Sequence, residues 1–266
     1  MNLKIKYLPI IIFLTIFSTS CTYQKLLKSS DTKAKYEKAK EYYEDGDYAK
    51  SMTLFEQLVP IYRGTVKGEE ISYYFAYCKY NLKNYIEAGH YFRRFIGSFP
   101  NSKFSEECAY MSAYCYYLDS PKTTLAQEST IKAISELQLY LGRYPESERV
   151  EECNELIDDL THKLQKKSFE NALLYYKIGQ YHAASVAFKS GLESFPDSKF
   201  REEMMCLVIK SDYIFAINSA HGKTVDRLNE ALKDYKSFVR EFPESKYMKE
   251  LTKIHNDINK KLDFLN

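Results

Sequence analysis

The chain is 266 residues long and carries 38 Lys and Arg residues against 36 Asp and Glu residues. Two of the lysines lie in an N-terminal segment that we predict is removed, so the mature chain is formally neutral. It has no basic tail and no basic stripe interleaved with aromatic residues, which argues against a nucleic-acid partner. It contains 25 Tyr and no Trp, and this excess of tyrosine needs a functional or structural reason.

The N-terminus has the pattern of a secretory signal peptide. Residues 1–7 include two lysines, residues 8–17 are an apolar run, and small residues then lead to Cys21. The apolar run is about half of the roughly 20 residues that a membrane-spanning helix needs, so we predict no permanent transmembrane anchor here. The segment resembles a bacterial lipoprotein signal, although Ser18 stands where such signals usually have Leu. This resemblance implies that residues 1–20 are removed and that Cys21 carries lipid such as palmitate; the alternative is an ordinary cleaved signal peptide.

Residues 21–32 show little periodicity, and we interpret them as a lipidated tether. From Lys33 onward the apolar spacing is helical. One short phrase then recurs, and each copy closes a segment patterned as two helices. The copies are Phe99-Pro100-Asn101-Ser102, Tyr144-Pro145-Glu146-Ser147, Phe195-Pro196-Asp197-Ser198 and Phe242-Pro243-Glu244-Ser245. A single helical hairpin cannot bury its own apolar face, so repeated hairpins must stack, which predicts a solenoid.

The spacing within three of the hairpins resembles the tetratricopeptide (TPR) repeat. In the first hairpin, Ala39 suits a close helix crossing, Gly46 a turn and Phe55 an interlocking aromatic contact. The second hairpin repeats the pattern from Ala76 onward. The fourth is the fullest match, with Ala172, Tyr176, Gly179, Tyr181, Ala184, Phe188 and Pro196. Each of these hairpins runs about 34 residues to its closing proline, which is the TPR period.

The third and fifth hairpins keep the TPR pattern in the second helix and the closing phrase, and we expect inserts at residues 119–129 and 218–223 between their first and second helices. No Pro or Gly interrupts residues 146–178, which predicts a single long helix there. Residues 246–265 are expected to form a capping helix. The prediction is an all-α fold, an α-solenoid of about five TPR hairpins. Hairpins 1–3 occupy residues 33–145. The long helix, hairpins 4–5 and the capping helix occupy residues 146–266.

A search for catalytic and metal-binding constellations finds no candidate. The five histidines are scattered, and the sequence has no Gly-rich phosphate loop. The pairs Glu106-Glu107 and Glu151-Glu152 begin predicted helices, where the helix dipole favours solvated acids. Five cysteines remain besides Cys21, and this odd number favours buried thiols over a complete disulfide framework. We therefore expect no enzyme, no catalytic residue, no metal and no cofactor.

The tyrosines suggest a peptide-binding groove. In TPR proteins the first helix of each hairpin lines the groove, and here these helices carry Tyr36, Lys40, Tyr43, Tyr73, Tyr77, Tyr80, Tyr110, Tyr114 and Tyr117. Tyrosine suits such a surface because it gives a large contact area with few rotatable bonds, together with a hydroxyl for polar partners. The alternative for each tyrosine is that it packs between helices.

Taken together, the lipoprotein signal, the length and the repeat layout resemble one family. The segments that carry the resemblance are Leu58-Val59-Pro60, Tyr62-Arg63-Gly64-Thr65, Tyr73-Tyr74, Ala76-Tyr77 and Tyr175-Tyr176 with Gly179 and Tyr181. They are similar to the BamD family of outer-membrane assembly lipoproteins, in the form found in Bacteroidetes. The resemblance covers the mature chain essentially from end to end.

The resemblance implies a non-enzymatic component of the β-barrel assembly (BAM) machinery, held by lipid on the periplasmic face of the outer membrane. Such proteins receive unfolded outer-membrane proteins with an aromatic C-terminal signal and dock onto the POTRA domains of the barrel protein BamA. We hypothesise that hairpins 1–3 capture the signal and that hairpins 4–5 hold a BamA-like partner. The alternatives are a periplasmic TPR scaffold for envelope maintenance or cell division, and a SusD-like glycan-binding lipoprotein, a family roughly twice as long that usually uses Trp.

Overall fold

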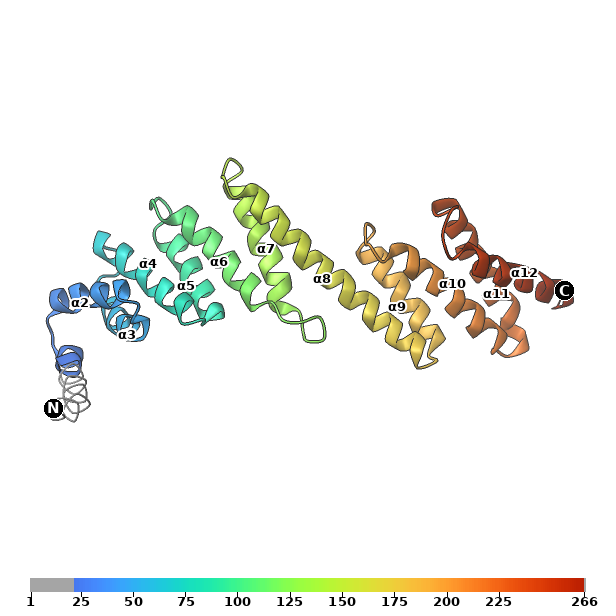
Figure 1. Cartoon of the computed structure of the whole chain (residues 1–266), viewed down its shortest axis with the longest axis horizontal. Coiled ribbons are helices and arrows are strands. Elements are labelled where there is room, and N and C mark those ends of the chain that lie inside the picture. The colour runs from blue at the N-terminus through green and yellow to red at the C-terminus, as the bar shows by residue number, and fades with distance from the viewer. Residues whose placement is uncertain (1–21, 266) are drawn as a thin grey trace, which may run out of the picture. The chain divides into compact units, whose positions relative to one another are not determined.

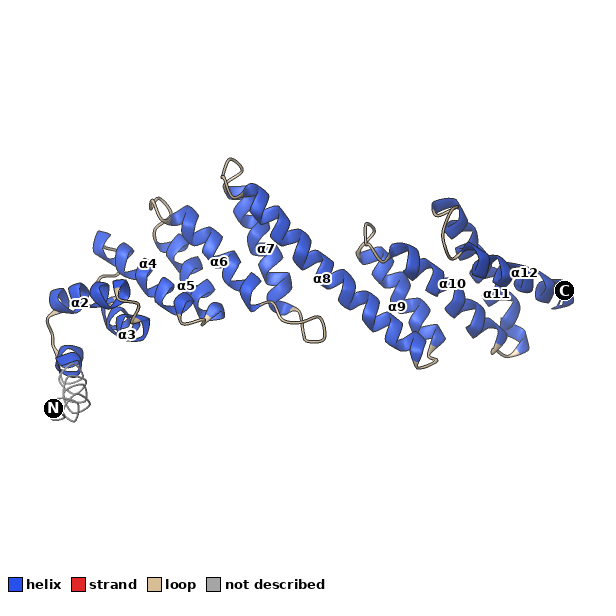
Figure 2. Cartoon of the chain, in the orientation of Figure 1, coloured by secondary structure: helices blue, strands red, loops and turns tan. Residues whose placement is uncertain are grey.

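The computed structural model describes residues 22–265, and every regular element in that range is a helix (Figure 2). Successive helices pair as antiparallel hairpins, which can be followed along the chain in Figure 1. The predicted all-α, TPR-like architecture is confirmed. The helices are α2 (Thr32–Glu44), α3 (Tyr48–Leu58), α4 (Val66–Asn81), α5 (Tyr85–Ser98), α6 (Ser105–Asp119), α7 (Glu128–Arg143), α8 (Val150–Lys177), α9 (Tyr181–Ser194), α10 (Arg201–Ile217), α11 (His221–Glu241) and α12 (Met248–Leu265).

The recurring aromatic-Pro-x-Ser phrase forms one turn geometry at all four places. In the first copy, the Ser102 N–H donates to the Phe99 carbonyl at 3.1 Å, and the Ser102 hydroxyl accepts from the Phe104 N–H at 3.0 Å. Ser147, Ser198 and Ser245 make the same pair of bonds in the other copies. Proline stops the preceding helix because the residue before it disfavours the α conformation. The phrase is therefore a helix stop joined to a polar cap for the next turn.

Three of the tight hairpin turns share a left-handed residue that closes the first helix. Gly46 has φ +79° and Gly179 has φ +78°, while the matching position of the second hairpin is Lys83 at φ 62°. In each turn the N–H of this residue donates to the carbonyl three positions back, and the next N–H donates to the carbonyl five positions back. This is the Schellman pattern, which satisfies the last carbonyls of the helix.

Small residues stand where the helices approach closely. Ala39, Ala76 and Ala172 are fully buried, as the TPR spacing predicts. A Cβ added at Gly89 would come within 3.2 Å of the Cys115 side chain, so only glycine fits this crossing without a shift. Large aromatic side chains such as Phe55, Phe92 and Phe188 fill the space between the helices and are also fully buried. Burial of these apolar side chains provides most of the stability of the hairpins.

The described chain forms two compact units. Unit 1 contains the described residues up to Ser120 together with Glu128–Cys153, and unit 2 contains Pro121–Gln127 and the described residues from Asn154 onward. The single helix predicted over residues 146–178 is confirmed as α8, which begins in unit 1 and continues into unit 2.

The two predicted inserts agree with the structure to different extents. The insert predicted at residues 119–129 is confirmed as the loop between α6 and α7. Within unit 2, Lys167 of α8 donates to the Thr123 carbonyl at 2.9 Å and to the Leu125 carbonyl at 2.6 Å, which fixes the tip of this loop. The insert predicted at residues 218–223 is shorter, because α11 already begins at His221. The predicted capping helix is confirmed as α12, which packs against α10 and α11.

The segment that follows Cys21 is not an irregular tether. Residues 22–28 are helical and pack on the first hairpin through Tyr23, Leu26 and Leu27. The Tyr23 hydroxyl donates to the Lys50 carbonyl at 3.3 Å, and the Lys35 ammonium donates to the Leu27 carbonyl at 3.0 Å. The prediction of a tether over residues 21–32 is thus wrong for residues 22–28. The described part of this helix is held by tertiary contacts, which the periodicity of the sequence does not reveal.

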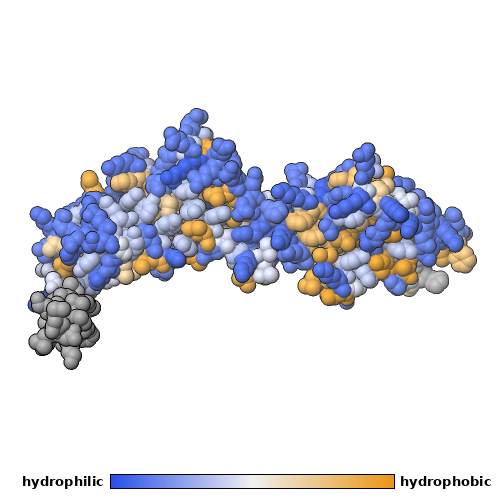
Figure 3. All heavy atoms as spheres, in the orientation of Figure 1, coloured by the Kyte–Doolittle hydropathy of each residue, from blue (hydrophilic) through white to orange (hydrophobic). Residues whose placement is uncertain are grey.

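On the face drawn in Figure 3, hydrophilic side chains predominate and hydrophobic residues form small separate groups. None of the helices within residues 22–265 combines the length and the apolar character needed to span a membrane.

Candidate peptide-binding surface

The nine residues predicted for the groove all lie on α2, α4 and α6, the first helices of the first three hairpins. We call them the tyrosine face. Side-chain bonds between consecutive first helices show that these helices are neighbours. The Tyr36 hydroxyl of α2 donates to Glu70 of α4, and the Tyr77 hydroxyl of α4 donates to Glu107 of α6 at 2.5 Å. Unit 1 therefore brings the predicted residues onto one continuous side of its hairpins.

A repeated tyrosine-to-carboxylate bond links one repeat to the next. Besides the bonds of Tyr36 and Tyr77, the Tyr110 hydroxyl of α6 donates to Glu152 at the start of α8, at 2.6 Å. Lys40 adds an ion pair to Glu70 at 3.0 Å. Hydrogen bonds to charged groups are stronger than neutral ones, so these contacts fix the register between successive first helices.

The first-turn acids were predicted to be solvated, and this holds only in part. Glu107 and Glu152 do begin helices, where the dipole favours them. Both nevertheless accept tyrosine hydroxyls from the preceding repeat, and Glu107 also pairs with Arg149 at 2.6 Å. The Arg149 guanidinium in turn lies 4.2 Å from the centre of the Tyr110 ring.

The members of the tyrosine face differ in exposure. Tyr36 and Tyr110 are each only 6% exposed, so for these two the packing interpretation is the better one. The remaining seven are partly exposed: Lys40, Tyr43, Tyr73, Tyr77, Tyr80, Tyr114 and Tyr117. Tyr43 also packs against the buried core that α2, α3 and α4 share. Accessible ring surface is thus concentrated on α4 and α6.

The rings of α4 and α6 form two short aromatic series. Tyr73 and Tyr77 lie 4.8 Å apart between ring centres, and Tyr77 and Tyr80 lie 6.2 Å apart. On α6, Tyr114 stacks against both Tyr110 and Tyr117 at 5.5 and 5.7 Å. Neighbouring rings hold one another in position, so a ligand would meet a preformed aromatic surface.

Several tyrosine hydroxyls of this surface have a raised pKa. Burial raises the pKa of Tyr77 above its usual value, and the adjacent Glu107 carboxylate raises it further. The same two causes, burial first and then Glu152, raise the pKa of Tyr110. Burial is also the largest cause that raises the pKa of Tyr73 and of Tyr80. These four hydroxyls are therefore neutral at physiological pH, and they lie beside apolar rings.

Sequence reasoning missed the carboxylates that complete this surface, namely Glu70, Glu107 and Glu152, and the cation Arg149. A signal for them exists in the sequence. The three bonded tyrosines are followed by their acids 34, 30 and 42 residues later, and a search for pairs at about this separation could have found them.

A similar arrangement recurs in unit 2. The Tyr213 hydroxyl of α10 donates to Asp257 of α12 at 2.5 Å, and Lys210 pairs with Glu250 at 2.6 Å. A hollow of about 400 Å³ lies beside the ends of these helices, next to Phe264, which is 88% exposed. Unit 2 also exposes Leu174, Ile178 and Val186 by more than half.

Metal and thiol chemistry finds little support in the described chain. Among residues 22–265, no group of three or more His, Cys, Asp and Glu side chains is placed to hold a metal ion. All five cysteines in this range are buried free thiols, which confirms the expectation of small apolar side chains. Burial raises the pKa of Cys78 to about 11 and that of Cys206 to about 12, which makes these thiols unreactive. Cys21, the predicted lipidation site, lies outside the described residues.

Known proteins similar to this chain include a curated relative and a solved structure. A relative from Aquifex aeolicus, named as a putative outer membrane protein assembly factor BamD, is 24% identical over 202 residues. The match covers 75% of this chain but only 64% of the Aquifex protein. Among solved structures, a TPR-repeat protein from Bacteroides fragilis matches with a TM-score of 0.42 and 12% identity, over 88% of this chain and 100% of that one. A TM-score this low does not establish a shared fold.

The family assignment rests on a longer match. Residues 28–228 match the model of the YfiO family, described as outer membrane lipoproteins. The matched range begins just before the first hairpin, includes the whole tyrosine face and ends within α11. The chain therefore belongs to the YfiO family of outer membrane lipoproteins.

Proposed function

We propose that the protein is a non-enzymatic, lipid-anchored component of outer-membrane β-barrel assembly. Membership of the YfiO family supports the compartment, and the Aquifex relative supports the assembly role. The preformed tyrosine face is the observation that carries the binding activity. The client is an unfolded outer-membrane protein, bound as an extended segment with aromatic side chains.

The anchor in this proposal is lipid on Cys21, at the periplasmic face of the outer membrane. The helix of residues 22–28 follows this position directly in the sequence and is packed on the first hairpin. Unit 1 would then be held close to the membrane surface, without a flexible spacer. Several acyl chains bind a membrane stably, since each buried methylene contributes about 0.8 kcal/mol.

The partner in this proposal is a BamA-like barrel protein that docks its POTRA domains on unit 2. Unit 2 supports it by exposing the apolar side chains Leu174, Ile178, Val186 and Phe264, which are available to contact a partner. The partner and the client would use different residues, since every member of the tyrosine face belongs to unit 1.

The test of client binding uses two tyrosines whose hydroxyls make no hydrogen bond within the described structure, Tyr80 and Tyr114. The double variant Tyr80→Ala, Tyr114→Ala removes two rings from the centre of the surface and spares the tyrosine-to-carboxylate bonds. We expect about tenfold weaker binding of a labelled peptide with an aromatic C-terminal signal, measured by fluorescence anisotropy. The matched control is Tyr175→Ala, an exposed tyrosine of unit 2. Equal affinity of the folded double variant and the control would refute the proposed binding surface.

A further inference from the structure

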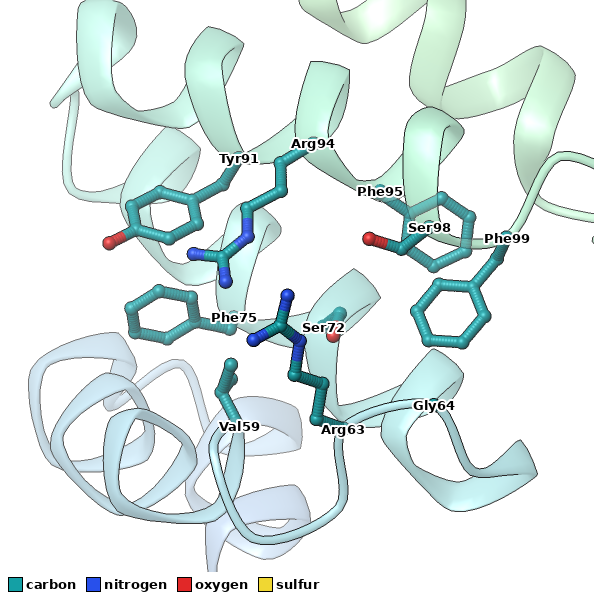
Figure 4. A pocket seen from close by; sticks show the side chains of 10 residues that line it. All are labelled: Val59, Arg63, Gly64, Ser72, Phe75, Tyr91, Arg94, Phe95, Ser98 and Phe99. Carbon is teal, nitrogen blue, oxygen red and sulfur yellow. The ribbon is translucent and has the colours of Figure 1, made fainter.

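A second candidate site lies within unit 1, away from the tyrosine face. Figure 4 shows a pocket bounded by the loop after α3, by α4 and by α5. On α4, the residues that line it are Ser72 and Phe75. At about 100° per residue these positions lie on roughly the opposite side of the helix from Tyr73 and Tyr77. None of the nine residues of the tyrosine face lines this pocket.

Two guanidinium groups converge in the pocket. Arg63 enters from the loop and Arg94 from α5, and Figure 4 shows both pointing into the space between the aromatic rings. Neither guanidinium has a carboxylate within ion-pair distance among residues 22–265, and no acid lines the pocket. Neighbouring cations are paired, since Lys79 binds Glu87 at 2.5 Å and Arg93 binds Glu136.

This arrangement concentrates positive charge at one place on the surface. Arg63 and Arg94 carry like charges and are both exposed, so water screens their mutual repulsion. An anion placed between them would turn the repulsion into two attractive contacts. The guanidinium fork matches a carboxylate in particular, because it can donate two parallel hydrogen bonds to the two oxygens.

The walls restrict the size and kind of the ligand. Phe75 and Phe95 are almost fully buried and form an apolar base, while Tyr91 and Phe99 flank the opening. The cavity of about 40 Å³ has room for one small anionic group, with the rest of the ligand outside. Outside, Ile61 lies in the same loop as Arg63 and is 60% exposed, and Val66, where the loop meets α4, is 89% exposed. They offer apolar contacts to the residues on either side of a bound carboxylate.

We propose that this pocket binds a carboxylate of a partner polypeptide, with Arg63 and Arg94 as the two donors. The carboxylate comes from an acidic side chain or from a chain terminus, and the exposed apolar residues of the loop hold the adjacent segment. The protein thus has a charge-selective contact for a partner on the side of the hairpins opposite the tyrosine face.

The experiment measures binding of three labelled eight-residue peptides to the detergent-solubilised full-length protein by fluorescence anisotropy. All contain glycine and serine around one phenylalanine. The first adds a glutamate and ends in an amide, the second adds a glutamine and ends in a free carboxylate, and the third adds a glutamine and ends in an amide. We expect at least one carboxylate peptide to bind about tenfold more tightly than the third peptide. The stronger of the first two identifies the source of the carboxylate.

The variants Arg63→Met and Arg94→Met should each weaken that binding about tenfold, and Arg63→Lys should weaken it less because the charge remains. Arg93→Met is the matched control, since Arg93 lies next to Arg94 on α5 but pairs with Glu136. Circular dichroism checks that each variant is folded. Equal binding of all three peptides, or unchanged affinity in both Met variants, would overturn the proposal. Displacement of the peptide by inorganic phosphate at lower concentration than by acetate, or binding to phosphatidylglycerol vesicles in place of peptides, would also overturn it.

Discussion

At the scale of single residues, the tyrosines serve two roles that sequence alone could not separate. Tyr36 and Tyr110 are buried donors that link successive repeats, whereas Tyr80 and Tyr114 expose part of their rings and make no hydrogen bond within the described structure. Spacing placed all of them correctly on the first helices. It could not tell which hydroxyl meets a carboxylate, because the carboxylate belongs to the next repeat.

A charged cluster in unit 2 shows the same dependence on distant residues. The Lys189 ammonium of α9 lies 2.9 Å from Asp212 of α10, and 3.2 and 3.0 Å from Glu230 and Asp234 of α11. Burial acts to lower the pKa of Lys189, but Asp212 and Asp234 together raise it above its usual value. Burial is the main cause that raises the pKa of Asp234, and the neighbouring Asp212 carboxylate adds to it. One cation thus holds three carboxylates together.

Replacing this cation should destabilise unit 2 in a pH-dependent way. We expect Lys189→Met to lower the free energy of unfolding by about 2 kcal/mol at pH 7.5, because it leaves partly buried carboxylates unpaired. A carboxyl group whose pKa is raised in the folded state favours folding at low pH, and this contribution is lost as pH rises through that pKa. The loss should therefore be smaller at pH 5 than at pH 7.5 in urea titrations.

The control for this prediction is Lys166→Met, whose pair with Glu170 is exposed and 3.9 Å long. Its effect should stay within about 0.5 kcal/mol. A loss for Lys189→Met that is the same at both pH values would contradict the assigned role of the carboxylates.

At the scale of elements, turn chemistry made the helix boundaries predictable. The four aromatic-Pro-x-Ser phrases end α5, α7, α9 and α11 at the expected places. The long uninterrupted helix α8 also followed from the absence of Pro and Gly. The helix of residues 22–28 did not, since it depends on contacts of Tyr23 and Leu27 with the first hairpin.

One hairpin turn departs from the sequence rule and offers a stability test. Lys83 occupies the left-handed position that Gly46 and Gly179 hold in their own turns. We expect Lys83→Gly to raise the free energy of unfolding by about 0.5–1 kcal/mol, because the left-handed conformation strains a side chain but not glycine. Thermal unfolding followed by circular dichroism measures the gain.

The converse substitution is the control. Gly46→Ala should destabilise by about 1 kcal/mol, and since a Cβ there meets no atom within 4 Å, backbone strain would be the cause. A Lys83→Gly variant that is no more stable than the original protein would show that the turn tolerates its lysine without strain.

At the scale of the whole molecule, the stacked hairpins and the family assignment could be predicted from the sequence. Repeat period, closing phrases and small residues at the crossings each point to the same architecture, and YfiO family membership agrees with it. The pocket of Arg63 and Arg94 could not be predicted, because Arg63 lies in the loop between the first two hairpins and Arg94 lies on α5. Binding sites of this kind arise between repeats, and no single repeat carries their signature.

The most direct test of the assembly role is the set of proteins that the chain holds in its own membrane. The full-length lipidated protein would be purified from native membranes in gentle detergent, and the co-purifying proteins identified and quantified by mass spectrometry. The proposed function predicts stoichiometric recovery of a β-barrel protein with POTRA domains. Its absence, with cell-division or glycan-uptake proteins recovered in its place, would contradict the assembly role.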